Sequence, residues 1–229
     1  MNQGTDTASI RVVTTVRNVL VQLGLETVIA QVEGLVLAAS ANEPTAITDA
    51  IRKHRPGIVI TDPEFAIRAL RDIHRLRRNV RLVLVSLREH FSVRDGIEPG
   101  AVCGFLGCNA FLDQIVALLG QTARCVGTTT LNARCADCPG RVTLLPPKLP
   151  LSSREAQVFE MIGTGKGTTD IAEALNLSVK TVEYYRQTIK RKLHLENGWE
   201  LNEAAILWRN GLSLPAHRLA ENGRRAKRR

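Results

Sequence analysis

The cysteines are the residues of this sequence with the clearest chemical potential, because thiolates bind soft metal ions and take part in redox reactions. Cys135 and Cys138 are separated by two residues, a spacing that lets two thiolates meet one metal ion or form a redox pair. A full zinc or iron–sulfur ligand set would also need Cys125, together with Cys103 or Cys108 brought close by folding. Three interpretations follow: unreactive thiols, a zinc or iron–sulfur site, or a redox switch.

No other group of residues has the pattern of an enzyme active site. The histidines are scattered without the spacing of a catalytic triad or a metal-ligand set, and no nucleophile stands beside a candidate base. The odd number of cysteines argues against a disulfide framework. We therefore expect no enzymatic activity and no structural disulfides.

The stretch from Leu151 to Leu195 predicts three helices separated by turns. Ser152, followed three positions later by a glutamate, caps the first helix, and glycines end it. Ser178 caps the third helix, which pairs with the short second helix as a helix-turn-helix. On the third helix one apolar stripe keeps helical spacing, while polar and basic side chains fall mostly on other faces: Lys180, Thr181, Tyr184, Gln187, Lys190 and Arg191.

These motifs resemble the DNA-binding domain of LuxR-type (FixJ-type) transcription regulators. The resemblance rests on the runs LSSRE, IAEAL and LSVKTVEYYRQTIKRKL, in this order. It implies a four-helix domain whose third helix enters the major groove of double-stranded DNA. The fourth helix, expected from Trp199 to Arg209, would make a dimer contact, with Trp199 itself in the core.

The same resemblance implies roles for individual side chains of the third helix. Glu183, Tyr184 and Gln187 are expected to face the bases, where glutamine can pair with adenine and glutamate can accept from cytosine. A homodimer is expected because one domain contacts only half of a binding site. The remaining contacts, to phosphates, are expected from Ser178, Lys180, Thr181, Tyr185, Lys190 and Arg191.

The N-terminal half alternates short apolar runs with amphipathic stretches, which is typical of a parallel sheet covered by helices on both faces. The order and spacing of the runs resemble the receiver domain of two-component response regulators, a flavodoxin-like, doubly wound (βα)5 fold. By this resemblance Asp62 matches the phosphate-accepting aspartate at the end of the third strand. Ser86 matches the hydroxyl residue that senses the phosphoryl group.

Two departures from the receiver pattern predict a degenerate, atypical receiver. Val16-Arg17 stands where the family has the acidic pair that holds Mg²⁺, and the family's lysine falls near Gly107-Cys108. We therefore expect Asp62 to cap the following helix or to pair with Arg17. A working phosphoacceptor at Asp62 is the alternative.

Length and composition fit a protein with an α/β domain followed by an all-α domain. A chain of 229 residues with 44% hydrophobic content can form two modest cores, and a net charge of +9 suits binding to phosphates. The predicted order is a flexible leader (1–9), a receiver-like domain (10–124), a linker with the Cys-x-x-Cys pair (125–149), the LuxR-type domain (150–212) and a basic flexible tail (213–229).

Together these features predict a sequence-specific DNA-binding transcription regulator that works independently of aspartyl phosphorylation. Phosphorylation of Asp62 and metal or redox sensing through Cys125, Cys135 and Cys138 are the alternatives. Neither a membrane-spanning run nor a signal peptide pattern is present, so we expect a cytoplasmic protein. RNA polymerase, a sensor kinase and a partner regulator are the candidate protein partners.

Overall fold

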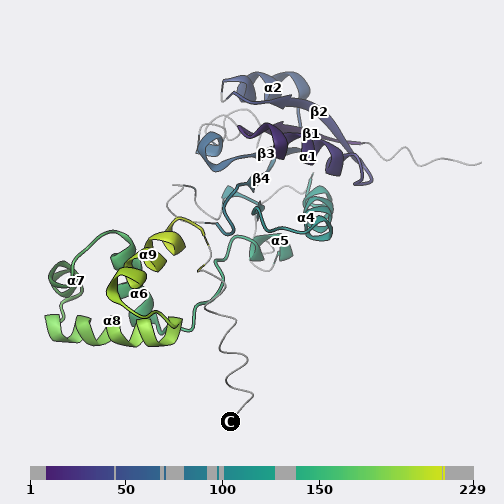
Figure 1. The fold of residues 1–229 in the computed structure, drawn as a ribbon. Helices are drawn as coiled ribbons and strands as arrows, with labels where there is room; N and C mark the ends of the chain where they lie inside the picture. Colours follow the sequence, from purple (N-terminus) through teal and green to yellow (C-terminus); the bar gives the residue numbers. More distant parts are fainter. Residues whose placement is uncertain are drawn as a thin grey trace, which may run out of the picture. The chain divides into compact units, whose positions relative to one another are not determined.

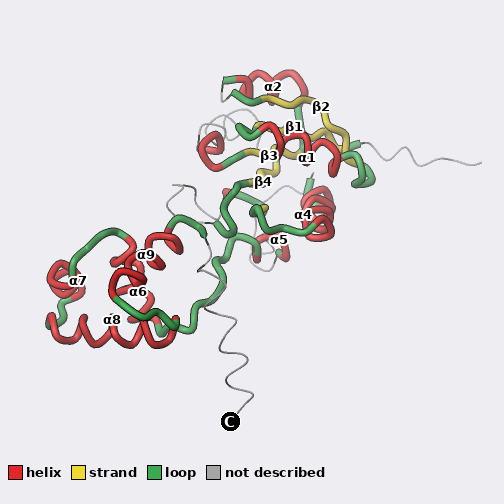
Figure 2. The backbone as a smooth tube through the Cα atoms, viewed as in Figure 1, coloured by secondary structure: helices red, strands yellow, loops and turns green. Residues whose placement is uncertain are grey.

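The computed structural model describes residues 9–43, 45–67, 70, 80–91, 97, 101–126, 138–212 and 214 (Figures 1 and 2). The chain divides into two compact units, with the boundary between Leu145 and Pro146. Most of the predicted leader (1–9) and tail (213–229), together with Cys135, lie outside the described residues. In the part of the chain that is described, no helix is long and apolar enough to cross a bilayer.

The first unit is built on a parallel sheet. Its neighbouring strands all run in the same direction, and most strand residues are buried because helices cover both faces. The spatial order is β2-β1-β3-β4-β5, which confirms the predicted doubly wound fold. The strands in chain order are β1 (Ile10–Thr15), β2 (Leu35–Ala41), β3 (Ile58–Thr61), β4 (Arg81–Val85) and β5 (Gly104–Leu106).

The two faces of this sheet are covered by different helices. α1 (Val19–Ile29) and α4 (Leu112–Arg124) pack on one face, and α2 (Ala46–His54) packs on the other. Successive strand residues point to opposite faces, so Val12 joins the core beneath α1 and α4, whereas Val13 joins the core beneath α2. The sheet therefore has two separate apolar layers.

Part of the stretch predicted as a linker belongs to this first unit. The short helix α5 (Pro139–Val142) packs on α4 and on β5. Thr143 Oγ1 accepts a hydrogen bond from the backbone N–H of Phe105 at 2.7 Å, and Leu144 is buried in the core beneath α2. The segment extends the unit from the predicted end at residue 124 to residue 145, because it covers the open edge of β5.

The second unit contains the helices predicted from the LuxR-type motifs. They are α6 (Ser153–Gly163), α7 (Thr168–Leu175), α8 (Val179–Leu193) and α9 (Gly198–Arg209). All four contribute apolar side chains to one shared core, in which α8 packs against each of the other three helices. The fully or almost fully buried members include Val158, Phe159, Ile171, Val182, Ile189 and Leu201.

Capping residues predicted from the sequence form the helix ends of this unit. Ser152 N–H donates to the carboxylate of Glu155 at 2.6 Å, and Ser152 Oγ accepts from the N–H of Glu155. Ser178 Oγ accepts from the N–H of Thr181 at 3.0 Å at the start of α8. Asn176 ends α7 in the left-handed conformation, with φ of 52°. These local signals fix where the helix-turn-helix bends.

The prediction that Trp199 lies in the core is wrong, because its side chain is 69% exposed. The buried side of α9 is formed by Leu201, Ala204 and Ala205. Trp208 packs against the core, and a separation of nine residues places two side chains on opposite sides of a helix. Once Trp208 faces inwards, Trp199 has to face outwards.

A charged pair joins α6 to α8. Oε2 of Glu155 lies 2.6 Å from Nζ of Lys192 and also accepts from the backbone N–H of Ser152. The Glu155 side chain is buried, whereas Lys192 remains about one-third exposed. The hydrogen bond from Lys192, followed by that from Ser152, lowers the pKa of the Glu155 carboxyl group below its usual value.

This pair predicts a pH-dependent loss of stability in Lys192→Met. The variant leaves a buried carboxylate without its cation, so we expect the free energy of unfolding at pH 7 to fall by about 1–3 kcal/mol. Because folding lowers the pKa of Glu155, the stabilisation is present above the unfolded-state pKa of about 4.3 and disappears as pH falls through the folded-state pKa. Urea denaturation at pH 7 and in the acid range measures the difference.

The matched control for this prediction is Lys166→Met, which removes an exposed lysine from the turn before α7. It should leave stability almost unchanged at both pH values. A Lys192→Met effect of equal size at neutral and acid pH would contradict the role of the ionised Glu155 carboxylate.

Candidate functional site

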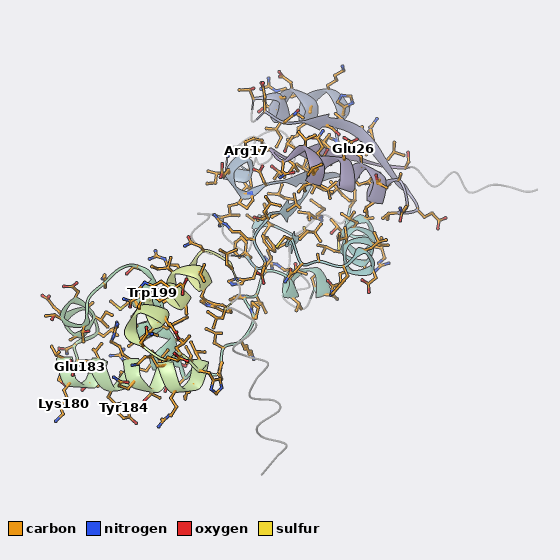
Figure 3. The ribbon with its side chains drawn as sticks, viewed as in Figure 1. Arg17, Glu26, Lys180, Glu183, Tyr184 and Trp199 are labelled. Atoms are coloured by element: carbon orange, nitrogen blue, oxygen red, sulfur yellow. The ribbon has the colours of Figure 1, made fainter. Side chains whose placement is uncertain are left out.

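The exposed side of α8 carries the three side chains that were predicted to contact bases, together with two of the predicted phosphate contacts, Lys180 and Arg191. Lys180, Tyr184, Gln187 and Arg191 follow one another at intervals of three or four residues and are exposed, with Glu183 beside them. Figure 3 shows Lys180, Glu183 and Tyr184 on α8. Tyr184 is 65% exposed, although an aromatic ring of this size is normally covered. The opposite side of α8 is buried in the core of the unit. We call these five residues the α8 stripe.

The other predicted contacts also have roles inside the unit. Ser178 Oγ and Thr181 Oγ1 are 2.7 Å apart and share a hydrogen bond at the start of α8. Tyr185 is half-buried against the core, with its ring edge-on to Tyr184 at a centroid distance of 6.1 Å. Lys190 is half-buried. The exposed N-terminal end and the α8 stripe are therefore the parts of α8 that a ligand can reach most fully.

Two basic side chains of α8 that the sequence prediction omitted are tied to neighbouring helices. Lys192 pairs with Glu155, and Nη2 of Arg186 donates to Oδ1 of Asn202 on α9 at 3.2 Å. Partial burial lowers the pKa of the Arg186 guanidinium from its high ordinary value. No local sequence pattern predicts these pairs, because the partners lie 37 and 16 positions away in the chain.

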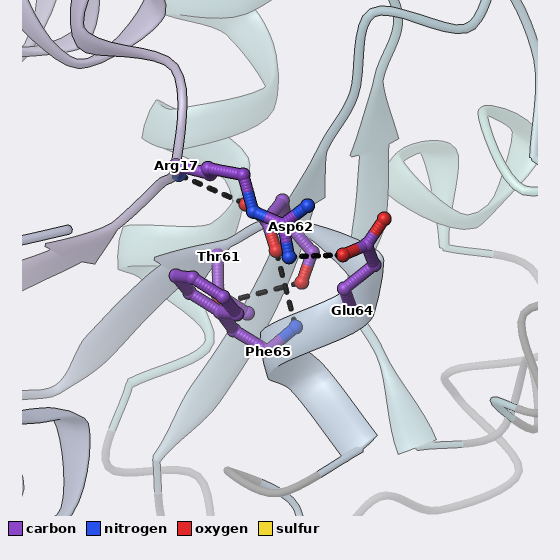
Figure 4. A network of polar contacts seen from close by, with 5 residues as sticks. All are labelled: Arg17, Thr61, Asp62, Glu64 and Phe65. Atoms are coloured by element: carbon purple, nitrogen blue, oxygen red, sulfur yellow. Dashed lines mark hydrogen bonds and ion pairs between the residues drawn. The ribbon is translucent and has the colours of Figure 1, made fainter. Parts of the chain in front are cut away.

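In the first unit, the parallel pairing of β1 with β3 brings residues 16–17 beside Asp62. Thr15 is in register with Thr61, and the Asp62 N–H donates to the Thr15 carbonyl at 3.3 Å. Oδ2 of Asp62 accepts from the backbone N–H of Arg17 at 2.9 Å, and Oδ1 accepts from the N–H of Phe65 at 3.1 Å (Figure 4). The Asp62 carboxylate thus caps the helical turn that follows it, as predicted.

The Arg17 side chain does not take part in this contact. Its guanidinium forms an ion pair with Glu64 and lies 5.5 Å from the centre of the Phe65 ring. The paired side chains are 65% and 63% exposed, so the ion pair contributes little to stability. The predicted pairing between Arg17 and Asp62 is therefore corrected, since the Arg17 backbone, not its guanidinium, contacts the carboxylate.

The strand ends do not gather the ligands of a magnesium-dependent phosphoryl site. Val16 is buried and apolar, and Glu64 is paired with Arg17. Among the described residues, no three histidine, cysteine, aspartate or glutamate side chains are grouped so that they could hold a metal ion. Mg²⁺ needs several oxygen ligands close to the acceptor. The residues present do not fit that requirement.

Two further positions, Gly107 and Ser86, match the receiver's lysine and hydroxyl residue, and both have close contacts with the loop at residues 88–89. A side chain at Gly107 would approach the carbonyl oxygens of Glu89 and Arg88 to 2.6 and 2.7 Å, so a lysine does not fit there without rearrangement. Ser86 Oγ accepts from the N–H of Arg88 at 3.2 Å. A cavity of about 440 Å³ opens here, lined by Val16, Arg17, Asn18, Val21, Asp62, Pro63, Glu64, Val85, Ser86, Leu87 and Arg88.

Two cysteines of the predicted site, Cys125 and Cys138, lie at helix ends. Cys125 ends α4, and its carbonyl accepts from Nε and Nη2 of the buried Arg81 at 3.0 and 2.9 Å. Cys138 precedes α5, and both thiols are free of disulfide bonds. Because Cys135 lies outside the described residues, the metal and redox hypotheses for this group stay predictions.

Sequence comparisons identify a LuxR-type domain in the second unit. Residues 149–205 match the family described as bacterial regulatory proteins, luxR family. The chain is 29% identical over 197 residues to the transcriptional activator protein ExaE of Pseudomonas putida, covering 82% of this chain and 91% of ExaE. It is 24% identical over 202 residues to the response regulator UvrY of Escherichia coli K12, covering 84% and 91% of the two chains. Residues 149–205 are thus a LuxR-type domain, and over most of its length the chain is similar to DNA-binding response regulators.

The same two-unit fold also occurs among solved structures. A complex of the two-component response regulator RcsB with DNA covers 85% of this chain and 96% of RcsB, with a TM-score of 0.53 and 18% identity. A structure of two RcsB dimers bound to two parallel DNAs gives a TM-score of 0.51 at the same coverage and identity. These likenesses confirm the predicted fold class: a receiver-like α/β unit followed by a LuxR-type helical unit.

The capping geometry of Asp62 predicts how its variants behave. Asp62→Ala should lose about 1 kcal/mol, because no side-chain acceptor remains for the backbone N–H of Phe65. Asp62→Asn should lose less, because its amide oxygen can still cap Phe65, although its NH2 group cannot accept from the N–H of Arg17. Urea denaturation of the full chain measures both, with Glu64→Gln as the control for loss of a neighbouring exposed charge. Equal losses in the Asn and Ala variants would contradict the capping role.

Proposed function

We propose that this protein is a homodimeric, sequence-specific transcription regulator that recognises DNA with α8 and works without phosphorylation of Asp62. The proposal rests on the α8 stripe, in which cations and side chains that can hydrogen-bond to bases share one exposed face of a helix. A helix exposed along one face and anchored along the other can enter the major groove without rearranging its core.

Base recognition is expected from the middle of the α8 stripe. The Gln187 amide can donate to and accept from the edge of adenine, and the Glu183 carboxylate can accept from the amino group of cytosine. Tyr184 offers an apolar ring face and a hydroxyl group between them. An acidic side chain near DNA phosphates is unfavourable unless it meets a base donor, so Glu183 contributes to sequence preference.

Phosphate contacts are expected from both ends of the α8 stripe. Lys180 lies in the first turn of α8 and Arg191 in its last turn, so the two cations flank the base-facing residues. Contacts of this kind fix the position of the helix on DNA and release counterions, which makes binding weaken with salt.

Two substitutions separate these roles. Lys180→Ala should weaken binding on all sequences and flatten the dependence of log K on log salt by about one unit. Gln187→Ala should cost about 1–3 kcal/mol on the preferred sequence and relax the preference at one base position. Selection of bound DNA from a random library, followed by titrations at several salt concentrations, measures both effects. Unchanged affinity in both variants would contradict recognition by α8.

A homodimer follows from the need for two half-sites. RcsB dimers are seen on DNA, and that protein shares the fold of this chain. On α9 the side chains of Trp199 and Ile206 are exposed and seven positions apart, which places them on one face of the helix. We assign this face to the contact between the two DNA-bound LuxR-type units, because exposed large apolar side chains at helical spacing typically mark a protein interface.

Independence from phosphorylation is supported by the geometry around Asp62. Both carboxylate oxygens accept hydrogen bonds from backbone amides, and the neighbouring positions supply an apolar side chain and a cation paired with Glu64. Phosphoryl transfer would have to break the cap and neutralise the incoming charge without a set of magnesium ligands.

Incubation with acetyl phosphate and Mg²⁺ tests this part of the proposal. We expect intact-mass measurement to show no labile adduct of about 80 Da on the wild-type chain, and no change in DNA affinity. An adduct that is absent from Asp62→Asn would overturn the proposal. The variant that combines Val16→Asp with Arg17→Asp, checked for folding by circular dichroism, tests whether the missing acidic pair is what prevents phosphorylation of Asp62.

A further inference from the structure

The cavity of about 440 Å³ beside Asp62 lies where the strand order of the sheet reverses. Its walls come from the carboxyl ends of β1, β3 and β4 (residues 16–18, 62–64 and 85–88) and from Val21 on α1. The chain leaves β1 towards β2 on one side and leaves β3 towards β4 on the other, so the two connections diverge and leave a crevice. Small-molecule sites typically have volumes of about 300–1,000 Å³. We call this crevice the strand-end cavity.

The inner wall of the strand-end cavity is apolar. Val16, Pro63 and Val85 are buried there, and Val21 is half-buried. Leu87 also lines the cavity but is 60% exposed, so it lies on the open side. A ligand with an apolar body would cover Leu87 and remove water from the inner wall, and both changes are favourable.

The charges that line the strand-end cavity cancel. Arg17 and Arg88 supply two cations, and Asp62 and Glu64 supply two carboxylates. Arg17 and Glu64 are already paired with each other (Figure 4). A charged ligand would therefore meet no net opposite charge, and it would lose water against an apolar wall at a high free-energy cost. This balance favours an uncharged ligand.

Two polar groups of the strand-end cavity keep hydrogen-bonding capacity for a ligand. Each carboxylate oxygen of Asp62 accepts one backbone N–H, from Arg17 or from Phe65, and a carboxylate oxygen can accept a second hydrogen bond. Ser86 Oγ accepts from the N–H of Arg88, and its own hydroxyl hydrogen meets no acceptor among the described residues. Asp62 can therefore accept from a ligand, and Ser86 can donate to it.

The acceptor and the donor follow neighbouring strands. Thr61 of β3 is in register with Leu84 of β4, so Asp62 and Ser86 stand at adjacent strand ends. Backbones of adjacent strands are about 4.8 Å apart. One small group that carries a donor beside an acceptor can therefore reach both side chains.

We propose that the strand-end cavity binds an uncharged small molecule with a largely apolar body and one amide-like group, such as a primary amide or a sulfonamide. The body contacts the inner wall at Val16, Val21 and Val85. The N–H of the amide-like group donates to the Asp62 carboxylate, and its oxygen accepts from the Ser86 hydroxyl group.

Dansyl amide is a fluorescent probe with this chemistry, because it joins an uncharged naphthalene body to a sulfonamide group. Titration into the full-length chain should give a saturable rise in probe fluorescence. The anionic dansyl sulfonate has the same body but no N–H donor, so it should bind at least about tenfold more weakly. Saturating dansyl amide should also raise the thermal midpoint of unfolding, because it binds the folded chain.

Two cavity variants and one matched control locate the bound probe. Val16→Asp places a carboxylate in the apolar wall and should weaken dansyl amide binding at least about tenfold. Ser86→Ala removes only the donor from a half-buried strand end and should weaken binding about fivefold. Leu23→Asp makes a similar change on the exposed side of α1, outside the cavity, and should bind as the wild type does. Circular dichroism checks the folding of each variant.

Four results would overturn the inference. They are the absence of saturable binding, equal affinity for the amide and the sulfonate, unchanged affinity in the folded cavity variants, and loss of binding in Leu23→Asp. The last result would place the probe on the outer side of α1.

This inference goes beyond the proposed function, and the two fail separately. If dansyl amide binds as expected but the chain selects no DNA sequence, the strand-end cavity is established as a site and the proposed function fails. If the chain selects DNA but binds no dansyl amide, recognition by α8 stands without the cavity site.

Discussion

A parallel sheet has to be buried on both faces, and this constraint determines where the first unit can place functional groups. Each crossover between strands puts a helix on one face, so the interior is filled by two apolar layers. Polar chemistry is left to the carboxyl ends of the strands and to the outer sides of the helices. Asp62 occupies the first of these two locations.

The same constraint explains why Asp62 and Arg17 are neighbours despite their distance in sequence. Adjacent parallel strands end side by side, so the residues after β1 and β3 meet whatever their chemistry is. In this chain the residues that meet there form a helix cap, made by the Asp62 carboxylate, and an exposed ion pair between Arg17 and Glu64.

Much of the architecture could be predicted from the sequence because its determinants are local. Ser152 and Ser178 indicate where helices begin, and the apolar runs of the N-terminal half indicate buried strands. Contacts between distant positions could not be predicted in this way. Lys192 finds Glu155 only through the packing of α8 on α6, and the direction of Trp199 depends on which side of α9 the core occupies.

The candidate site was predictable to the same degree. The α8 stripe follows from helical periodicity, so the side chains that share the exposed face could be named in advance. The contact of Thr143 with Phe105 could not, because the segment that covers β5 has little apolar periodicity and is placed by a hydrogen bond to a strand edge. Sequence patterns predict buried positions that recur at regular spacing better than they predict single polar contacts.

The docking of residues 138–145 on β5 has a mechanical consequence for the second unit. With that segment fixed in the first unit, the second unit begins directly at Pro146, and Leu149 already packs against the core of the second unit. Three of the residues 146–150 are proline, whose rings fix the backbone φ angle. The connection between the two units therefore has little conformational freedom to lose.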